Sequence, residues 1–357
     1  MKPENNKIDF NNQQFFIGID VHKKSWKVTI RSGKIVLKTF SMNPSPMELY
    51  KHMNRNYPGG EYYSVYEAGF SGYWTHRELK KYGFKSIIVA PTNVPTSGKE
   101  RLIKTDKIDS RKLARELENG ALPENYIPNL LEQEMRSLSR LRYQQVRKQT
   151  RIKNQIKSYL DFYGHKLPEN CELQHWSKRF VEHLRNIKFE YEMGAKQLEF
   201  YLDELLLYRS RLLQIIRDLR SYSQKHGIYE YIQLLMKIPG VGFVTAITLY
   251  TELMDITRFS NVEKLASYVG LVPTIRSSGE KKNVLGICVQ CNRYLRSLII
   301  ESAWVAIRKD PALTLAFNNY LRRMSSQEAI VRIAKKLLNR INYVWRKKEK
   351  YVCSVVG

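Results

Sequence analysis

The feature that most constrains the fold is a change in the apolar pattern of the sequence near Pro128. Before it, short runs rich in β-branched and aromatic residues alternate with polar turns and with segments of helical spacing. After it, residues 130–163 and 176–224 keep apolar residues three and four positions apart and contain few Gly or Pro. We therefore predict an α/β region followed by a mostly helical one.

The first region, residues 1–128, has the pattern of a mixed sheet with helices on its faces. Three runs within residues 15–40 have the composition of strands and are separated by polar turns, which favours hairpins. Predicted strands then alternate with predicted helices. The later strands are expected at 62–68 and 85–91, and the helices at 44–57, 71–83 and 105–120.

The helical part divides into a linker, residues 129–228, and a C-terminal domain, residues 229–357. Two long helices joined near 165–171 favour either an antiparallel hairpin or a coiled-coil arm that pairs subunits. In the C-terminal domain the pattern predicts a helix, a tight Gly turn and a helix over 234–253. We also expect a shorter helix at 261–273, an irregular or hairpin-like segment at 274–291, and helices at 292–309 and 326–350.

The charge of the chain predicts a polyanionic partner. Its 60 Lys and Arg residues outnumber 34 acids, for a formal charge of +26 and a pI near 9.8, which suits nucleic acid or an anionic membrane. No apolar run approaches the ~20 residues of a spanning helix, and the first ten residues lack the apolar core of a signal peptide. Four scattered cysteines (Cys171, Cys288, Cys291 and Cys353) suit a reducing cytoplasm, so we expect a cytoplasmic, nucleoid-associated protein.

Four acids stand where a metal centre would need them. Asp20 and Glu67 end two predicted strands, while Asp106 and Asp109 are three apart at a predicted helix start and share one face. Asp20 lies inside an apolar run, where an unpartnered charge is costly. Clustered carboxylates repel one another unless a hard cation such as Mg²⁺ neutralises them. In a basic protein, this pattern favours phosphoryl transfer on nucleic acid over ordinary surface charge.

Several basic residues are candidates for nucleic-acid binding. The stretch 136–157 carries eight basic residues and no acid, a pattern that is costly unless an anion is expected, although it could also be a solvated face. A Gly- and Pro-containing basic loop precedes the helix that carries Asp106. The candidates from these segments and from the C-terminal domain are Lys99, Arg101, Lys104, Arg136, Arg140, Arg147, Arg151, Arg276, Lys281 and Arg293.

Gly240 and Gly242 flank Val241 in a turn between two predicted helices. A helix-hairpin-helix turn of this kind presents backbone N–H groups and a helix N-terminus to a phosphate. The alternative is a plain connection between helices, because G-x-G is common. The positive charge of the chain favours phosphate binding.

Two further motifs indicate a function less specifically. Ser277 and Ser278 lie in a Gly-flanked turn among cations, where a serine could attack a phosphodiester, although a polar turn is the ordinary interpretation and nothing marks a partner base. Cys288 and Cys291 form a lone C-x-x-C, whereas a structural zinc site needs four ligands, so we interpret them as small core or loop residues.

Taken in order, seven segments resemble the DEDD-type insertion-sequence transposases, the family of bridge-RNA-guided recombinases related to the pilin-gene invertases. They are GIDVHK from Gly18, YEA with Glu67, TDKIDSRKLA, IPGVGFVTA, LASYVGLVP, SSG and NRYLR. The resemblance extends over nearly the whole chain. It implies a RuvC-like (ribonuclease-H-like) domain at 1–128, a helical coiled-coil linker and a mostly helical transposase domain.

The resemblance also implies roles for individual residues. Asp20, Glu67, Asp106 and Asp109 would be the DEDD acids that bind Mg²⁺, and Ser278, or else Ser277, would form a covalent link to DNA in a composite site with them. It further implies a structured guide RNA that pairs with donor and target DNA, and assembly as a dimer or tetramer. The chain departs from the family around 285–292, where it has Cys288, Val289 and Cys291 and relatives commonly have a basic residue and a glycine.

The sequence therefore predicts a Mg²⁺-dependent, RNA-guided DNA recombinase that moves its own insertion element. One alternative is a RuvC-like nuclease that resolves branched DNA with water as the nucleophile. The other is a non-catalytic nucleic-acid-binding scaffold, which leaves the acids in apolar surroundings unexplained.

Overall fold

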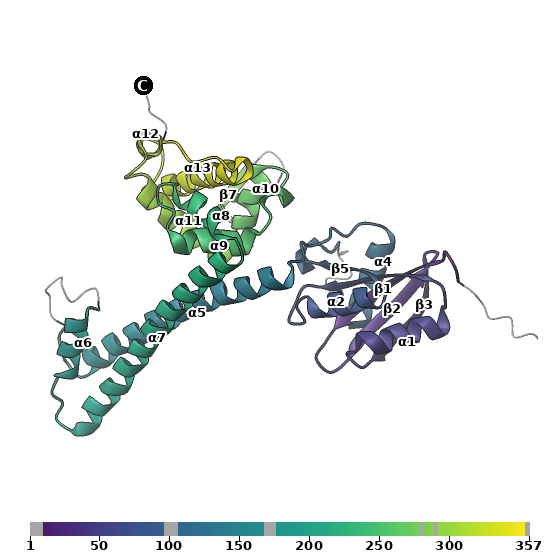
Figure 1. Cartoon of the computed structure of the whole chain (residues 1–357), viewed down its shortest axis with the longest axis horizontal. Helices are drawn as coiled ribbons and strands as arrows, with labels where there is room; N and C mark the ends of the chain where they lie inside the picture. Colours follow the sequence, from purple (N-terminus) through teal and green to yellow (C-terminus); the bar gives the residue numbers. More distant parts are fainter. Residues whose placement is uncertain (1–9, 96–105, 168–175, 279–280, 289–290, 354–357) are drawn as a thin grey trace, which may run out of the picture. The chain divides into compact units, whose positions relative to one another are not determined.

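The computed structural model describes residues 10–95, 106–167, 176–278, 281–288 and 291–353, with side chains left out for 274–285. The chain divides into two compact units, residues 1–127 and residues 128–357 (Figure 1). Among the described residues, no helix is long and apolar enough to cross a membrane.

The first unit is built on a mixed five-stranded sheet, as predicted. Its strand order is β3-β2-β1-β4-β5; β1, β2 and β3 pair antiparallel, whereas β4 runs parallel to β1 and to β5. The strands are β1 (Gln14–Val21), β2 (Trp26–Ser32), β3 (Ile35–Met42), β4 (Glu61–Glu67) and β5 (Lys85–Val89). The helices are α1 (Pro46–Asn56), α2 (Trp74–Lys81), the 3₁₀ turn η1 (Pro91–Asn93) and α4 (Asp106–Glu118).

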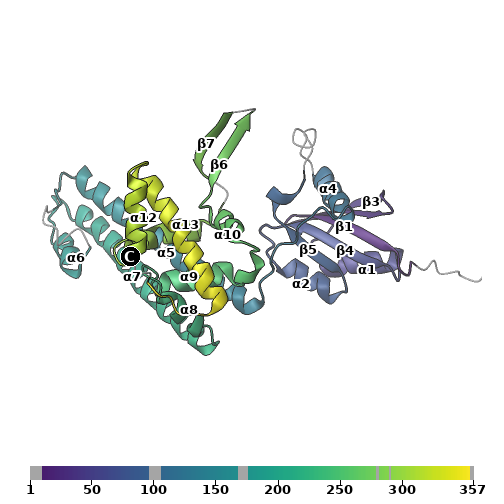
Figure 2. The same cartoon turned by 90° about the horizontal axis from the view of Figure 1, so that it is seen from above.

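Helices cover both faces of this sheet (Figure 2). Successive side chains of a strand point to opposite faces, so alternate residues of β1 face different helices. Ile17 and Ile19 pack in one core with Leu49 of α1 and Leu79 of α2. On the other face, Val65 and Val89 pack with Leu113 of α4.

A backbone contact seats α4 on the central strand. A Cβ atom added to Gly18 would lie 2.1 Å from the carbonyl oxygen of Ser110 and 2.5 Å from the amide nitrogen of Ala114. The hydroxyl groups of Ser110 and Thr29 are 2.9 Å apart, and an Arg31–Glu118 ion pair of 2.7 Å fixes the far end of α4. The missing side chain at position 18 therefore sets how closely α4 approaches β1.

The second unit contains the helical part of the chain. Its first helices are α5 (Leu130–Phe162), α6 (Lys178–Arg185), α7 (Glu192–Lys225), α8 (Tyr229–Met236) and α9 (Phe243–Leu253). They are followed by η3 (Ile256–Arg258), α10 (Val262–Val269), the strands β6 (Pro273–Ser278) and β7 (Lys281–Ile287), α11 (Arg293–Ala306), α12 (Pro311–Leu321) and α13 (Ser326–Lys347).

The long helices α5 and α7 lie side by side and antiparallel (Figure 1). Ile152 and Leu160 share a core with Leu198 and Leu205, and α6 closes that core with Phe180. The prediction of one continuous helical stretch over 176–224 was wrong, because the chain breaks after Asn186 so that the apolar face of α6 can fold onto the pair.

The other ends of α5 and α7 join the core of the C-terminal helices. Met135 and Leu219 belong to the apolar cluster formed by α8 to α13. The strands β6 and β7 pair antiparallel as a hairpin that extends away from these helices (Figure 2). Of the two interpretations of residues 274–291, the hairpin is the one observed. The sequence did not predict α12, which Asp310 caps and Pro311 opens.

Candidate active site

The sheet brings Asp20 and Glu67 to one edge. In the parallel pairing of β1 with β4, Ile19 lies opposite Tyr66, so the next residue of each strand is an acid at its carboxyl end. The alternation of side chains puts Asp20 on the face of Gly18 and Glu67 on the face of Val65. Because α4 packs on both Gly18 and Val65, both acids stand on the face that α4 covers.

The start of α4 brings further acids to the same corner. The Asp106 Oδ1 atom lies 3.7 Å from His22 Nε2, and His22 Nε2 lies 3.1 Å from Asp20 Oδ2. One ligand atom from each of these three residues lies within 4.8 Å of the other two. Asp109 is close enough to act on the charge of Asp20, and its own Oδ1 is 3.3 Å from the Lys112 ammonium.

The surroundings of Asp20 disfavour its negatively charged form. Burial raises the pKa of Asp20, and the negative Asp106 and Asp109 raise it further, against the opposing effect of His22. The Asp20 side chain is 22% exposed, so it remains open on one side. An ion that entered there would relieve the repulsion that raises this pKa.

The donor set fits a divalent cation. Hard cations prefer carboxylate oxygens, and a metal–ligand distance of about 2.1 Å puts neighbouring donors about 3 Å apart and opposite donors about 4 Å apart. The separations of 3.1 and 3.7 Å that join His22 to the two carboxylates fall in this range. Among the residues that the structure describes, the group that meets this spacing is Asp20, His22 and Asp106. Glu67 lies at the end of the adjacent strand, so a metal-binding role for all four predicted acids stays a prediction.

His22 is the residue at this corner that the sequence reasoning missed. It lies one residue past the end of β1 and two positions after Asp20, the spacing that turns two side chains of an extended chain to the same side, and that signal could have found it.

The hairpin of the second unit carries the predicted serines. Ser277 pairs with Lys282 and Ser278 with Lys281 at the end of the β6–β7 ladder. The side chains of these residues and of Arg276 lie outside the described part of the structure. The nucleophilic role of Ser278 therefore stays a prediction.

A buried carboxylate anchors the base of this hairpin. Glu252 is fully buried and accepts two hydrogen bonds from the Arg140 guanidinium, at 2.7 and 2.8 Å. Asn292, which follows the hairpin, donates to Glu252 at 2.8 Å and caps α11 with its side-chain oxygen. The Tyr268 hydroxyl donates to the Glu252 carbonyl oxygen at 3.3 Å. The network thus ties α5, α9, α10 and α11 together.

These contacts give two predicted nucleic-acid residues a structural role. Arg136 is buried and donates to the carbonyl oxygen of Thr251 at 2.9 Å, and Arg140 is held by Glu252. Gly240 also has a packing role, because at φ +84° a Cβ atom there would lie 2.2 Å from the Ser302 carbonyl oxygen. The sequence could not indicate these partners, which lie more than fifty residues away in the chain.

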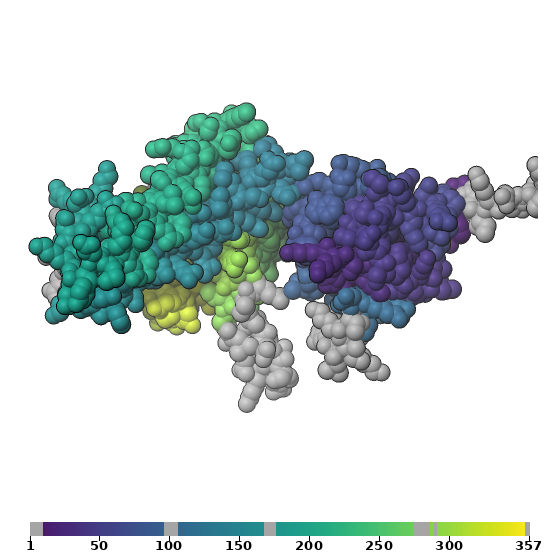
Figure 3. Space-filling model, turned by 90° about the horizontal axis from the view of Figure 1, so that it is seen from below, coloured from purple at the N-terminus to yellow at the C-terminus, as the bar shows by residue number. Residues whose placement is uncertain are grey.

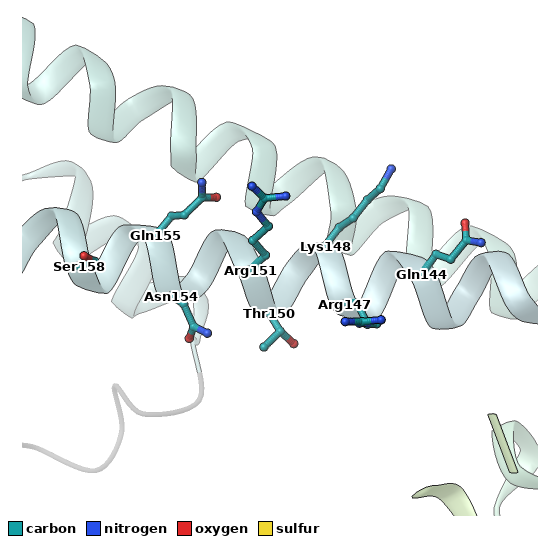
Figure 4. Close-up of a pocket in the computed structure, with 8 residues that line it drawn as sticks. All are labelled: Gln144, Arg147, Lys148, Thr150, Arg151, Asn154, Gln155 and Ser158. Carbon is teal, nitrogen blue, oxygen red and sulfur yellow. The ribbon is translucent and has the colours of Figure 1, made fainter. Parts of the chain in front are cut away.

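Other predicted nucleic-acid residues lie on open surface. Arg147 and Arg151 belong to an exposed polar face of α5 (Figure 4). None of the eight residues that line this face is acidic: Gln144, Arg147, Lys148, Thr150, Arg151, Asn154, Gln155 and Ser158. In Figure 3 the pair of α5 and α7, in teal, forms an elongated ridge of the second unit.

The remaining candidates are either exposed or outside the described residues. Gly242 is exposed at the N-terminus of α9, and Arg293 is exposed at the start of α11. Lys99, Arg101 and Lys104 lie outside the described residues. Contact of any of these residues with nucleic acid stays a prediction.

Two models of protein families match segments of this chain. A model of DEDD-type IS110 transposases, described as "Transposase", matches residues 17–165, and the "Transposase IS116/IS110/IS902 family" model matches residues 232–318. The first segment contains all four acids and the second contains Ser278. The two matches thus cover the segments that carry the predicted acids and the predicted nucleophile.

Individual relatives match over most of their length. A Sinorhizobium fredii protein named as a transposase, y4qE, is 27% identical over 83% of this chain and 72% of its own. The transposase for insertion sequence element IS1111A of Coxiella burnetii is 26% identical over 81% and 79%. The transposase for insertion sequence element IS1533 of Leptospira borgpetersenii is 24% identical over 70% and 72%.

Proposed function

Because the chain belongs to the DEDD-type insertion-sequence transposases, we propose that it inserts and excises its own element by cutting and rejoining DNA strands. Enzymes of this class act on DNA, in keeping with the charge of +26. The observation that supports the proposal most is the convergence of Asp20 and Asp106 beside His22 at the edge of a mixed sheet. We also assign the first unit to the RuvC-like folds, on the order of its acids along strand, strand and helix.

The acids would hold the divalent cation, Mg²⁺. Asp20 and Glu67 offer oxygens from adjacent strand ends, and Asp106 and Asp109 offer them from the first turn of α4. When bound, the cation would polarise the scissile phosphate and lower the pKa of the attacking hydroxyl. The seat of α4 on Gly18 keeps the two sets of oxygens at a fixed spacing.

Ser278 is the proposed nucleophile, with Ser277 as the alternative. Its hydroxyl oxygen forms a bond to phosphorus while the bond from phosphorus to one deoxyribose oxygen breaks, and that oxygen leaves as a hydroxyl after taking up a proton. Rejoining reverses the exchange, with a new DNA hydroxyl as the attacking group. The energy of the phosphodiester is thereby kept in the serine ester, so no nucleotide cofactor is needed.

A structured guide RNA would select the DNA sequences by pairing with donor and target. The protein would then hold backbones and RNA shape rather than read base edges. The exposed face of α5 suits that task, because it presents Arg147, Lys148 and Arg151 among neutral hydrogen-bonding side chains. We further propose that the active enzyme is a dimer or tetramer at the nucleoid, paired through the long helices.

The decisive experiment traps the protein on DNA. Wild-type protein with Mg²⁺, guide RNA and labelled element ends should give a covalent adduct that survives denaturant. Ser278→Ala should remove the adduct and Ser277→Ala should retain it. Strand cutting without any adduct in the wild type would favour the hydrolytic nuclease. Unchanged DNA processing after Asp20→Asn would favour the scaffold.

The RNA is tested separately. Copurified RNA should map to the sequence that flanks the gene, and recombination should stop when that RNA is omitted. Changing one guide loop should redirect insertion to the complementary DNA. Recombination at the original site without RNA would rule out guidance while leaving the transposase assignment intact.

A further inference from the structure

We propose that His22 supplies a nitrogen ligand to the cation held by Asp20 and Asp106, and thereby shifts the preference of the centre from Mg²⁺ toward Mn²⁺ and Co²⁺. The inference rests on the proposed function, since it concerns the same metal centre. It adds a residue outside the four acids and gives the centre a chemical character that carboxylates alone would not produce.

The geometry of His22 carries the proposal. A single ring atom, Nε2, lies near both carboxylates, 3.1 Å from Asp20 Oδ2 and 3.7 Å from Asp106 Oδ1. A residue that only oriented Asp20 would need one of these contacts. An atom that approaches two acids from different elements, one on β1 and one on α4, lies in the middle of the donor set.

The surroundings of His22 leave this nitrogen available. Among the described residues, both polar partners of the ring are carboxylates of the centre, so no other group competes for Nε2. The side chain is 51% exposed, which leaves the ring room to adjust its position toward an ion. The next side chain, Lys23, is engaged elsewhere, with its ammonium 6.0 Å from the centre of the Phe70 ring.

The chemistry of the donor set then predicts the cation preference. Mg²⁺ favours an all-oxygen shell and gives up its waters reluctantly, whereas later divalent metals bind imidazole more tightly. An imidazole beside carboxylates therefore favours Mn²⁺ and Co²⁺ over Mg²⁺, and the histidine also discourages the larger Ca²⁺.

The test uses the full chain and reads the ligand directly. Mn²⁺ bound to wild type should show a ¹⁴N coupling in pulsed electron paramagnetic resonance, and ¹⁵N-histidine labelling should change it. His22→Gln, which keeps a polar side chain of similar reach, should abolish the coupling. Calorimetry should show Mn²⁺ binding weakened about tenfold or more by this change, with Mg²⁺ binding weakened less. The exposed His183, substituted as His183→Gln, is the matched control and should leave both unchanged.

The outcomes separate the two proposals. Mn²⁺ binding that is lost in Asp20→Asn but shows no nitrogen coupling would overturn the role of His22 and leave the metal centre in place. Equal weakening of Mn²⁺ and Mg²⁺ by His22→Gln would reduce His22 to a residue that positions Asp20. Absence of any divalent binding by folded wild type, with circular dichroism as the check, would overturn both.

Discussion

Asp20 in the first unit and Glu252 in the second are carboxylates in apolar surroundings, but they differ in the number and charge of their partners. Glu252 is fully buried and receives two hydrogen bonds from Arg140 and one from Asn292. Within the described part of the chain, Asp20 has one hydrogen-bond partner, His22, and two acidic neighbours, Asp106 and Asp109. The Arg140 guanidinium balances the charge of Glu252, whereas the acidic neighbours of Asp20 add to its negative charge, which a bound cation would balance.

The difference separates an acid with a structural role from the acid proposed to bind a cation. A buried ion pair does not by itself make a fold more stable, but removing one member leaves an uncompensated charge. A partly open cluster of like charges costs stability in the free protein and makes sense where a cation binds. The number and sign of the partners, rather than burial, separate the two cases.

The largest effect should come from Asp20→Asn. Loss of one oxygen donor with its charge should reduce DNA recombination by about a hundredfold to a thousandfold, the size of effect that follows loss of a preorganised electrostatic group, as measured on element-end substrates. The folded pKa of Asp20 lies above its unfolded value, so the ionised carboxylate opposes folding at neutral pH and its removal should not lower stability. A variant that loses activity only because it melts earlier would break the comparison.

Glu252→Gln, in contrast to Asp20→Asn, should lower the stability of the fold. It leaves the Arg140 guanidinium without its counter-charge, at a cost of about 3 kcal/mol in the free energy of unfolding. Urea denaturation would measure this, and Arg140→Met combined with Glu252→Gln should recover part of the loss. If Glu252→Gln is as stable as wild type, the carboxylate is not the structural acid that its contacts indicate.

The acid stability of the first unit is a separate test, because a buried histidine there also has a shifted pKa. Burial, aided by Lys80 and Arg77, lowers the pKa of His76 to about 4. The unfolded chain then binds more protons between pH 6.5 and 4, so stability should fall by about 3 kcal/mol as pH drops through that window. His76→Gln should flatten this slope in denaturation measured across pH, and an unchanged slope would assign it to other groups.

The smallest expected effect is the gain in fold stability when a divalent cation binds. Mg²⁺ or Mn²⁺ at ten times its dissociation constant should stabilise wild type by about 1.4 kcal/mol, seen as a small rise in Tm. Glu252→Gln should keep this increment, since its change lies in the other unit, and Asp20→Asn should lose it. A rise of equal size in Asp20→Asn would place the ion elsewhere.

The parts of the fold that follow local periodicity could be predicted from the sequence. Alternation along β1 and β4 puts Asp20 and Glu67 at strand ends, and the spacing of Asp106 and Asp109 puts them on one helix face. These patterns need only neighbouring residues, which is why the sequence predicted the mixed sheet and the acids at strand ends and a helix start.

Partners distant in sequence could not be predicted. Arg140 was assigned to nucleic acid because it belongs to a basic run, but it pairs with Glu252, 112 residues away. Arg136 is buried by the same packing. The break between α6 and α7 was missed because the apolar spacing continues across it, and only the core around Leu202 shows why the chain must turn.

The close approach at Gly18 has a consequence for engineering this enzyme. Most core positions tolerate a new methyl group if a neighbouring side chain shrinks, but here the neighbours are main-chain atoms that no substitution can trim. A saturation library across β1 should therefore return a single permitted residue at position 18, flanked by positions that accept several. A change in the spacing between the oxygens of Asp20 and those of Asp106 and Asp109 would therefore require a different backbone path for α4.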